Sequence, residues 1–336
     1  MTPVWLLQVF HLTKSFEQNP FLGSRLLNCL GLHVARVLVA HAVMRFRAQL
    51  LSPLVASEDR AAYRRDGFLV IRDVLSPEAF TALTLEVRHF DGTEARECVQ
   101  GDTVNRRIPL DPETLLGLPA CRALLQQNRV CRRLLQWAAA TLRPPFTFVE
   151  QLFHAHQQDD RPDPQKHLHS DTFHPTMKGW LFLEDVSAEK GPFSYVTGSH
   201  RLTFARLRWE YRQSIAGRSL PDRYSRKGSL RLSEADRIAL GLPQPTALEV
   251  PANTLVIANT FGFHARSSAP AGSTRLALYA DSRTNPFNPL PGIDLPWVDA
   301  LQYRLLRRHR LRLDRQAARH GAQSSWHLVR EGAPEK

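Results

Sequence analysis

The chain has 336 residues, of which 43% are hydrophobic, with 44 Lys and Arg against 32 Asp and Glu, a formal net charge of +12. This length and apolar content allow a sizeable core, and we expect one large domain with extensions rather than two equal domains. A basic surface favours an anionic partner, whether nucleic acid, acidic membrane or phosphorylated or carboxylated substrate, although a soluble protein without a specific charged partner fits it equally.

The cysteines and the apolar segments exclude several classes of protein. The four cysteines form no C-x-x-C pair and no disulfide framework, so we read them as reduced thiols of a cytoplasmic protein. The first twenty residues lack a basic start followed by an apolar core and a small-residue cleavage site, so no secretory signal is expected. No run of 18 uncharged apolar residues occurs, which argues against a membrane-spanning helix.

Residues 1–56 are predicted to form a helical N-terminal extension. Its most apolar part, Leu26–Leu51, is interrupted by Arg36, Arg45 and Arg47. Such a basic amphipathic helix is typical of a helix that lies on an anionic membrane surface. It is equally typical of a helix that packs on the protein's own core, which is the interpretation we favour.

The next elements are signalled by turn and capping residues. Ser57 is predicted to cap a helix that starts at Glu58, and Asp66-Gly67 precedes a β-branched run to Leu75. Ser76-Pro77 should open another helix, and apolar periodicity predicts further helix over residues 112–142. The remaining runs read as short strands: 146–156, 179–186, 192–196, 252–259 and 274–280.

Helices early and strands late predict an α+β fold whose strands form an antiparallel barrel or jelly roll. We expect the principal domain at residues 57–290, interrupted near 204–248 by a polar, Arg-rich insertion. Loops of that length often act as lids or binding elements, but a surface excursion fits the sequence too. A basic helical C-terminal tail is expected over residues 291–336.

The segment KHLHSD contains the first candidate metal ligands. His169 and Asp171 are two residues apart, so on a strand both side chains project from the same face. His264 follows an apolar strand 95 residues later. Two histidines and one carboxylate leave adjacent positions open on an octahedral metal, which suits Fe(II) oxygenases. Among 14 histidines a bare H-x-D is weak evidence by itself, and several competing imidazoles lie nearby: His154, His156, His167 and His174.

Arg275 lies eleven residues beyond His264, on a predicted strand. A buried guanidinium needs an anionic partner, and its planar fork suits the distal carboxylate of an oxo-acid. Thr274 is expected to add a hydroxyl beside it. The alternatives are an internal salt bridge from Arg275 to Asp281, and the use of Arg266 in its place.

Four segments in this order resemble the phytanoyl-CoA dioxygenase family of Fe(II)/2-oxoglutarate oxygenases, across roughly residues 60–285. They are DGFLVIRDVLSPEAF, HSDTFH, EKGPFSYVTGSHRL and PANTLVIANTFGFHARSSAPAGSTRLALYA. The resemblance implies a double-stranded β-helix, also called a jelly-roll or cupin-like barrel, flanked by helices. It also implies that His169, Asp171 and His264 bind Fe(II), that Arg275 binds 2-oxoglutarate, and that His200 belongs to a structural turn.

The reaction implied by the resemblance consumes O₂ and 2-oxoglutarate, releases succinate and CO₂, and hydroxylates a substrate. We expect a small or acyl/lipid-like substrate, with Gln151 donating to the near carboxylate of 2-oxoglutarate or satisfying backbone at a strand edge. Lys166 and Lys178 flank the site and either attract an anionic substrate or are solvated.

Two other classes of function stay open. One is an oxygenase acting on nucleic acid, although no aromatic and basic interleaving typical of a stacking platform is present. The other is a non-catalytic metal-binding barrel that binds a partner or a membrane. Peripheral contact of the basic helices with an anionic membrane is a further expectation.

Overall fold

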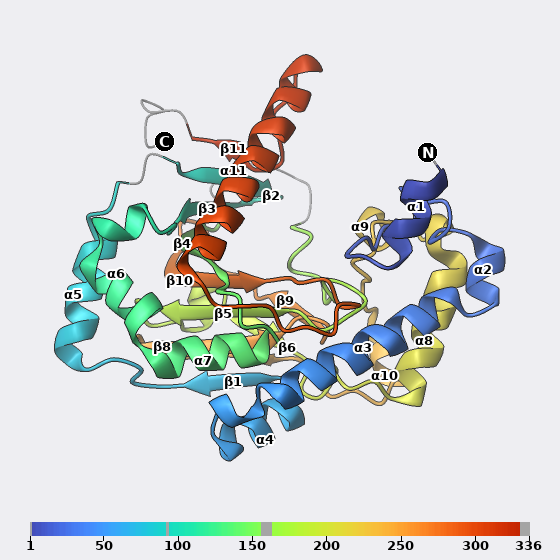
Figure 1. The fold of residues 1–336 in the computed structure, drawn as a ribbon, viewed down its shortest axis with the longest axis horizontal. Helices are drawn as coiled ribbons and strands as arrows, with labels where there is room; N and C mark the ends of the chain where they lie inside the picture. The colour runs from blue at the N-terminus through green and yellow to red at the C-terminus, as the bar shows by residue number, and fades with distance from the viewer. Residues whose placement is uncertain (1, 92–93, 156–162, 330–336) are drawn as a thin grey trace.

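A computed structural model of the chain describes residues 2–91, 94–155 and 163–329. It is a mixed α and β structure built around a large antiparallel sheet (Figure 1). In spatial order the eight strands are β1 (Phe68–Ile71), β8 (Thr254–Asn259), β5 (Met177–Phe182), β10 (Thr274–Ser282), β4 (Phe146–Phe153), β3 (Thr103–Pro109), β2 (Arg96–Gln100) and β11 (His327–Leu328). A second sheet contains β7 (Thr246–Ala247), β6 (Phe193–Tyr195) and β9 (His264–Arg266).

Side chains alternate between the two faces of the large sheet, as strand geometry requires. On β8, Leu255 and Ile257 belong to the core beneath the helices, whereas Val256 and Ala258 join an aromatic cluster on the opposite face. That aromatic cluster includes Phe193 and Tyr195 of the second sheet. The face that meets the second sheet is called the inner face below, and the other the outer face.

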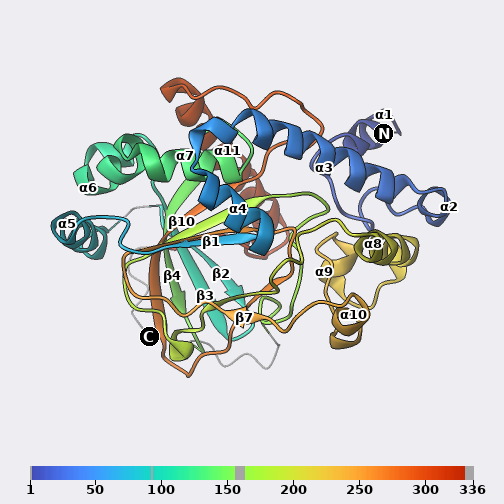
Figure 2. The same cartoon turned by 90° about the horizontal axis from the view of Figure 1, so that it is seen from below.

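The outer face is covered by helices from the first half of the chain. They are α4 (Ser57–Asp66), α5 (Pro77–Arg88), α6 (Pro119–Arg122) and α7 (Arg129–Ala138), and Figure 2 shows α6 and α7 along one side of the sheet. Leucines of these helices and of the sheet form the largest hydrophobic cluster. Because this layer buries most of the apolar residues of the principal domain, it fixes the sheet in place.

The N-terminal residues form three helices, α1 (Thr2–Val9), α2 (Arg25–Cys29) and α3 (Leu32–Leu50), and α2 and α3 lie against α8 (Phe204–Ala216) (Figure 1). A buried polar network connects them. His33 of α3 contacts Glu210 at 2.8 Å, and Arg206 donates to the same carboxylate at 3.0 Å. The N-terminal segment is therefore built into the structure through α8.

The segment 204–248, expected as a polar insertion, is largely helical. It contains α8, α9 (Arg223–Arg226) and α10 (Glu234–Ala239). Buried Trp209 packs edge-on against Phe263, next to a predicted metal ligand. The insertion predicted from the sequence is therefore built from packed helices in the structure.

Other boundaries differ locally from the expected ones. Ser57 is the first residue of α4 rather than its cap, and its hydroxyl donates to Glu58. Ser76 does cap α5, by accepting from the Ala79 amide at 3.3 Å. The expected continuous helix over 112–142 is broken by a π-helical turn (Ala123–Gln127) before α7.

Towards the C-terminus the chain forms α11 (Pro296–Arg319). The strand expected to reach His156 ends at Phe153, and His156 itself lies outside the described residues. None of the helices in the described ranges combines the length and hydropathy needed to cross a membrane.

Candidate metal centre and its cavity

Two of the predicted ligands, His169 and His264, face each other across a pair of backbone hydrogen bonds. The amide of each donates to the carbonyl of the other at 3.0 Å, so the two residues form a narrow antiparallel bridge. Their rings lie 4.4 Å apart between centroids. This bridge explains how a short segment near residue 169 and the start of β9 present two imidazoles to one point.

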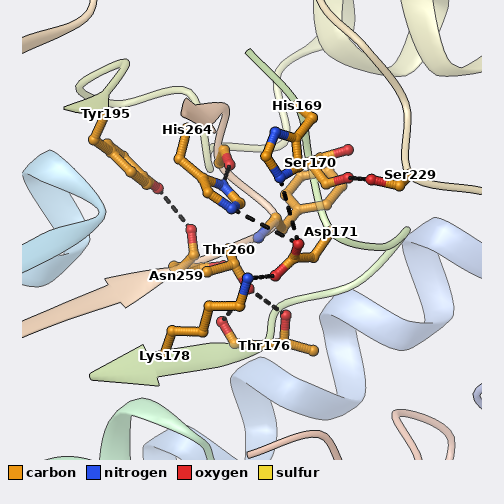
Figure 3. Close-up of polar contacts among 12 residues, drawn as sticks. His169, Ser170, Asp171, Thr176, Lys178, Tyr195, Ser229, Asn259, Thr260 and His264 are labelled. Atoms are coloured by element: carbon orange, nitrogen blue, oxygen red, sulfur yellow. Dashed lines mark hydrogen bonds and ion pairs between the residues drawn. The ribbon is translucent and has the colours of Figure 1, made fainter. Parts of the chain in front are cut away.

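Asp171 completes the cluster. Its amide donates to the Thr260 carbonyl at 2.9 Å, which fixes the backbone beside the end of β8. Its Oδ1 then lies 3.7 Å from Nε2 of both His169 and His264 (Figure 3). One ligand atom of each of the three buried residues lies within 4.8 Å of the others. The spacing suits a single metal ion, although residues 169–171 form a bridge and a bend, not the regular strand expected from the sequence.

Both imidazoles are oriented by backbone carbonyls. Nδ1 of His169 contacts the His167 carbonyl at 2.8 Å, and Nδ1 of His264 contacts the Gly262 carbonyl at 2.9 Å. These contacts favour the tautomer with the proton on Nδ1, so the lone pair of Nε2 faces the cluster. Both Nε2 atoms are buried without a hydrogen-bond partner among the described residues, so their lone pairs fit the role predicted for them as metal donors.

The charge states of the cluster also suit a cation. Burial holds the pKa of His169 well below its usual value and lowers the pKa of His264 to about 4, so both rings are neutral. Burial alone would raise the pKa of Asp171, but the Lys178 ammonium holds it well below its usual value. Two neutral imidazoles and one carboxylate are therefore available together at neutral pH.

Two lysines contact Asp171, and the sequence did not reveal their role. Lys178 of β5 lies 2.7 Å from Asp171 Oδ2, the oxygen turned away from the histidines (Figure 3). Lys14, from the loop after α1, donates to the backbone carbonyl of Asp171. Burial, assisted by nearby cations that include Arg283, lowers the pKa of Lys14 to about 7. The alternation on β5 marks Lys178 as inward-facing, but no local pattern connects Lys14 with a residue 157 positions away.

A cavity of about 230 Å³ opens from the cluster along the inner face of the sheet. Besides the three cluster residues it is lined by Arg107, Glu150, Lys178, Trp180, Phe193, Arg275, Tyr279, Arg283 and Trp326, among others. Arg107 is paired with buried Glu150, and Trp180 donates to the other oxygen of that carboxylate at 3.1 Å. Trp326 shows that the region after α11 reaches the cavity, which the reading of a basic C-terminal tail did not anticipate.

Arg275 is buried in this cavity and forms no ion pair with an acid of the described residues. It donates to the Gly191 carbonyl and lies over the Phe182 ring. Burial lowers the pKa of Arg275 to about 10, while the charge of Glu150 opposes that shift. The expected alternative, a salt bridge to Asp281, is not formed. Arg275 is thus a buried cation with capacity for an added anion.

The Gly-Pro turn of the segment EKGPFSYVTGSH positions the Gly191 carbonyl, which accepts a hydrogen bond from Arg275. Gly191 has φ +59°, and a Cβ there would lie 2.8 Å from the ring of His154. A few residues further along the segment, the Ser199 hydroxyl accepts from the Phe263 amide at 2.8 Å, directly before His264. His200 lies beside Gly67 and outside the metal cluster. The segment therefore supports both His264 and Arg275.

Two predicted cofactor residues are not brought to the cavity. Gln151 lies between Glu150 and Leu152 on β4, and these neighbours line the cavity while Gln151 does not. Thr274 is exposed at the start of β10, one residue out of phase with Arg275. Each is next in sequence to a residue that lines the cavity, and neighbouring side chains on a strand point to opposite faces.

The remaining flanking cations have partners. Arg266 lines the cavity but is paired with buried Asp163 at 2.8 Å, so it is no substitute for Arg275. Lys166 pairs with Asp102 at 2.9 Å. His167, the rival of His169, is exposed, and only its carbonyl contacts the cluster.

The end of the 204–248 segment also supports the centre. The Ser170 amide donates to the Leu230 carbonyl at 3.0 Å, and the Leu232 amide donates to the Leu168 carbonyl at 2.9 Å. These bonds hold the metal segment on its second edge, opposite His264. The insertion consequently positions the ligands, which a reading from composition alone did not detect.

A sequence model described as "Phytanoyl-CoA dioxygenase (PhyH)" matches residues 63–232, half of the chain. The chain belongs to the phytanoyl-CoA dioxygenase family. The match contains His169, Asp171 and the Gly-Pro segment, whereas His264 and Arg275 follow it. The family resemblance inferred from the four sequence segments is thereby confirmed.

Solved structures resemble this dioxygenase-family chain over 68% of its length. They include the epimerase SnoN in complex with Fe³⁺, alpha ketoglutarate and nogalamycin RO, with 18% identity, 83% of that chain covered and a TM-score of 0.45. HygX from Streptomyces hygroscopicus, with nickel and 2-oxoglutarate bound, has 20% identity, 86% coverage and a TM-score of 0.41. AviO1 from Streptomyces viridochromogenes has 19% identity, 94% coverage and a TM-score of 0.40. No curated protein matches the sequence.

Proposed function

We propose that this chain is an Fe(II)- and 2-oxoglutarate-dependent dioxygenase that hydroxylates a small or acyl/lipid-like substrate and releases succinate and CO₂. The observation that carries the proposal is the buried cluster of His169, Asp171 and His264, with the unpaired Arg275 in the same cavity. Family membership supports the oxygenase class.

The donor set supports iron as the resident metal. Two imidazole nitrogens and one carboxylate oxygen form the facial set typical of non-haem Fe(II) oxygenases. The two Nε2 atoms are buried and free of hydrogen bonds among the described residues, and their opposite ring nitrogens are held by carbonyls. We therefore assign His169, Asp171 and His264 as the iron ligands.

The cavity chemistry supports a dicarboxylate co-substrate. Arg275 offers a planar guanidinium that suits bidentate binding of a carboxylate. Of the other cations that line the cavity, Arg107, Arg266 and Lys178 are already paired with acids, and Arg283 is exposed rather than buried. Arg275 is accordingly the residue we assign to the distal carboxylate of 2-oxoglutarate.

When bound, Fe(II) supplies the O₂ chemistry that couples decarboxylation of 2-oxoglutarate to oxidation of a substrate C–H bond. The chain's own residues orient the metal-binding carboxylate and shield the cavity from water. Lys178 holds Oδ2 of Asp171, so that Oδ1 is directed at the histidines. Trp180 and Phe193 pack at 4.7 Å between ring centroids and wall the cavity against water.

The two-sheet arrangement supports a jelly-roll reading of the principal domain. We propose that the eight-stranded and three-stranded sheets are the two layers of the double-stranded β-helix over residues 57–290, and that residues 1–56 and 291–336 are helical extensions of it. The metal segment lies between the layers, where His264 begins a strand of the smaller sheet.

The proposed function is tested by measuring succinate formed from 2-oxoglutarate with Fe(II) and O₂, with and without a cell extract as the source of substrate. His169→Ala and Asp171→Ala should each lower succinate formation at least about a hundredfold. His167→Ala is the matched control, because that ring is exposed two residues away, and it should keep activity. If the two ligand variants turn over 2-oxoglutarate like the wild type, the assignment is wrong.

A further inference from the structure

Helix α3 directs a mostly apolar face to solvent and buries two arginines. The side chains it directs to solvent recur at helical spacing and are mostly apolar: Ala35, Leu38, Val39, Ala42, Arg45, Phe46, Gln49 and Leu50. Phe46 and Leu50 are each 52% exposed. In a helix that rests on a protein and faces water, the polar residues normally occupy this outer side.

The buried side of α3 carries three polar residues, His33, Arg36 and Arg47, beside the apolar Val37, Ala40 and Met44. His33 contacts Glu210, as described above. Arg36 donates to the carbonyls of Val9 and Thr13, each at 2.7 Å, and lies over the Phe173 ring.

Arg47 is held still more completely on the same side. It is 1% exposed and donates to the Ala140 carbonyl at 2.6 Å and to the Thr284 hydroxyl at 2.7 Å. Two further carbonyls, those of Asn285 and Asn288, accept from its Nη1. Turning α3 to hide its leucines would leave Arg36 and Arg47 without these acceptors, so the inward polar face fixes the apolar face outward.

The exposed apolar surface continues onto the two preceding helices. Scattered exposed leucines are normal, but a gathering of them on consecutive elements marks an interaction surface. On α1, α2 and the residues just after each, the large apolar side chains exposed by about half or more are Val4, Leu6, Leu7, Phe10, Leu26 and Leu30. Figure 1 shows α1 and α2 at one end of the molecule, from which α3 runs along the lower edge towards α4. Residues 4–50 are called the N-terminal arm below.

The charge of the arm selects among possible partners. Three of its five basic residues, Lys14, Arg36 and Arg47, are partly or fully buried, so its exposed charged side chains are Arg25 and Arg45 against Glu17. A two-fold contact between two copies would therefore supply only one acid for every two exposed arginines. An anionic lipid surface accommodates both the exposed apolar side chains and the exposed arginines. It accepts apolar side chains below the headgroups and cations among the headgroups.

We propose that the N-terminal arm is a membrane-docking surface that lies in the plane of an anionic bilayer. The exposed stripe of α3 enters the interfacial layer, while Arg36 and Arg47 keep the helix attached to the protein from behind. No membrane-spanning segment is needed for this mode, and none is found in the described helices. The proposal does not depend on the reaction assigned to the metal centre.

Flotation of the purified full chain with vesicles tests it. Vesicles of phosphatidylcholine with phosphatidylglycerol should carry the protein upward, and phosphatidylcholine vesicles should carry much less. The double variant Leu38→Glu, Phe46→Glu should reduce the bound fraction at least tenfold. The matched control is Leu311→Glu, Leu313→Glu on α11, which changes two exposed leucines of the other basic helix and should leave flotation unchanged.

Thermal unfolding of each variant checks that the exposed substitutions leave the fold intact, and sedimentation velocity checks the oligomeric state. A folded wild-type chain that stays at the bottom of the gradient with anionic vesicles overturns the proposal. So does equal flotation of the α3 variant, or a dimer that the α3 variant dissociates in the absence of lipid binding. Succinate formation in solution should be the same in both double variants, which separates this test from that of the metal centre.

Discussion

The two faces of the large sheet are built by the same strands and are filled by opposite chemistry. On β10, Arg275, Tyr279 and Asp281 line the inner cavity of about 230 Å³, whereas Leu278 and Ala280 line an outer cavity of about 410 Å³ beneath α7. The larger, more apolar cavity is therefore not at the metal cluster. In this protein, buried and incompletely paired polar groups mark the candidate site better than the size of a cavity does.

The inner face owes its stability to pairing, since isolated buried charges are costly. Glu150 receives Arg107, Trp180 and, more weakly, Asn105. The outer face owes its stability to apolar burial. Substitutions on the two faces should consequently differ in their effects on the free energy of unfolding and on Fe(II) binding.

Removing the partner of Glu150 should have the largest effect. Arg107→Met leaves a fully buried carboxylate without its guanidinium and should lower the free energy of unfolding by about 3–5 kcal/mol. Urea unfolding measures it. The double variant Arg107→Met, Glu150→Leu should regain much of the loss. A single variant that is as stable as the wild type would show that the inner face does not depend on pairing.

On the outer face, Ile257→Ala removes a fully buried side chain from the main cluster. The cavity it leaves should cost about 2–5 kcal/mol of unfolding free energy. Because Ile257 points away from the metal cluster, the Fe(II) dissociation constant of the folded variant should be unchanged. A weakened affinity would mean that the two faces are mechanically coupled.

Lys178→Met should affect the metal, unlike Ile257→Ala. It removes the cation that holds Asp171 Oδ2, and should weaken Fe(II) binding about 10- to 100-fold. Calorimetric titration under anaerobic conditions measures the affinity. Lys166→Met is the matched control, since Lys166 pairs with Asp102 and contacts none of the ligands. Equal Fe(II) affinities in the two variants would show that Lys178 does not contribute to metal binding.

The smallest effect concerns acid stability. Burial lowers the pKa of His41 to about 3, so the unfolded chain binds a proton there more readily than the folded one. Stability from this group is complete above the unfolded pKa of about 6.5 and is lost as pH falls below it. His41→Leu should reduce the slope of unfolding free energy against pH between about 4 and 6 by up to about 1.4 kcal/mol per pH unit. An unchanged slope would assign the acid sensitivity to other groups.

The sequence predicted the residues whose local pattern is closely tied to chemistry. His169, Asp171, His264 and Arg275 follow from motif spacing and from the Gly-Pro segment, and the structure brings all four to one cavity. Their roles as ligands and co-substrate anchor stay predictions. Gln151 and Thr274 do not line that cavity, because the phase of a strand, not the residue type, decides which face a side chain reaches.

What the sequence did not predict depends on contacts between distant segments. Lys14 reaches Asp171 across 157 positions, and the Leu230 and Leu232 backbone holds the metal segment from an insertion without a motif. The orientation of α3 also escaped prediction, because its Leu and Arg periodicities are both helical. Only the acceptors around Arg47 show which side is buried.

The most direct test of the central claim is the stoichiometry of Fe(II) binding to the purified chain, measured by anaerobic titration. The account predicts one ion per wild-type chain and none for His264→Ala. The matched control is His154→Ala, which removes another buried histidine whose ring nitrogens are unpaired among the described residues, and it should keep one ion. Retention of the full ion in His264→Ala, or its loss in His154→Ala alone, would contradict the assignment of His169, Asp171 and His264 as the metal centre.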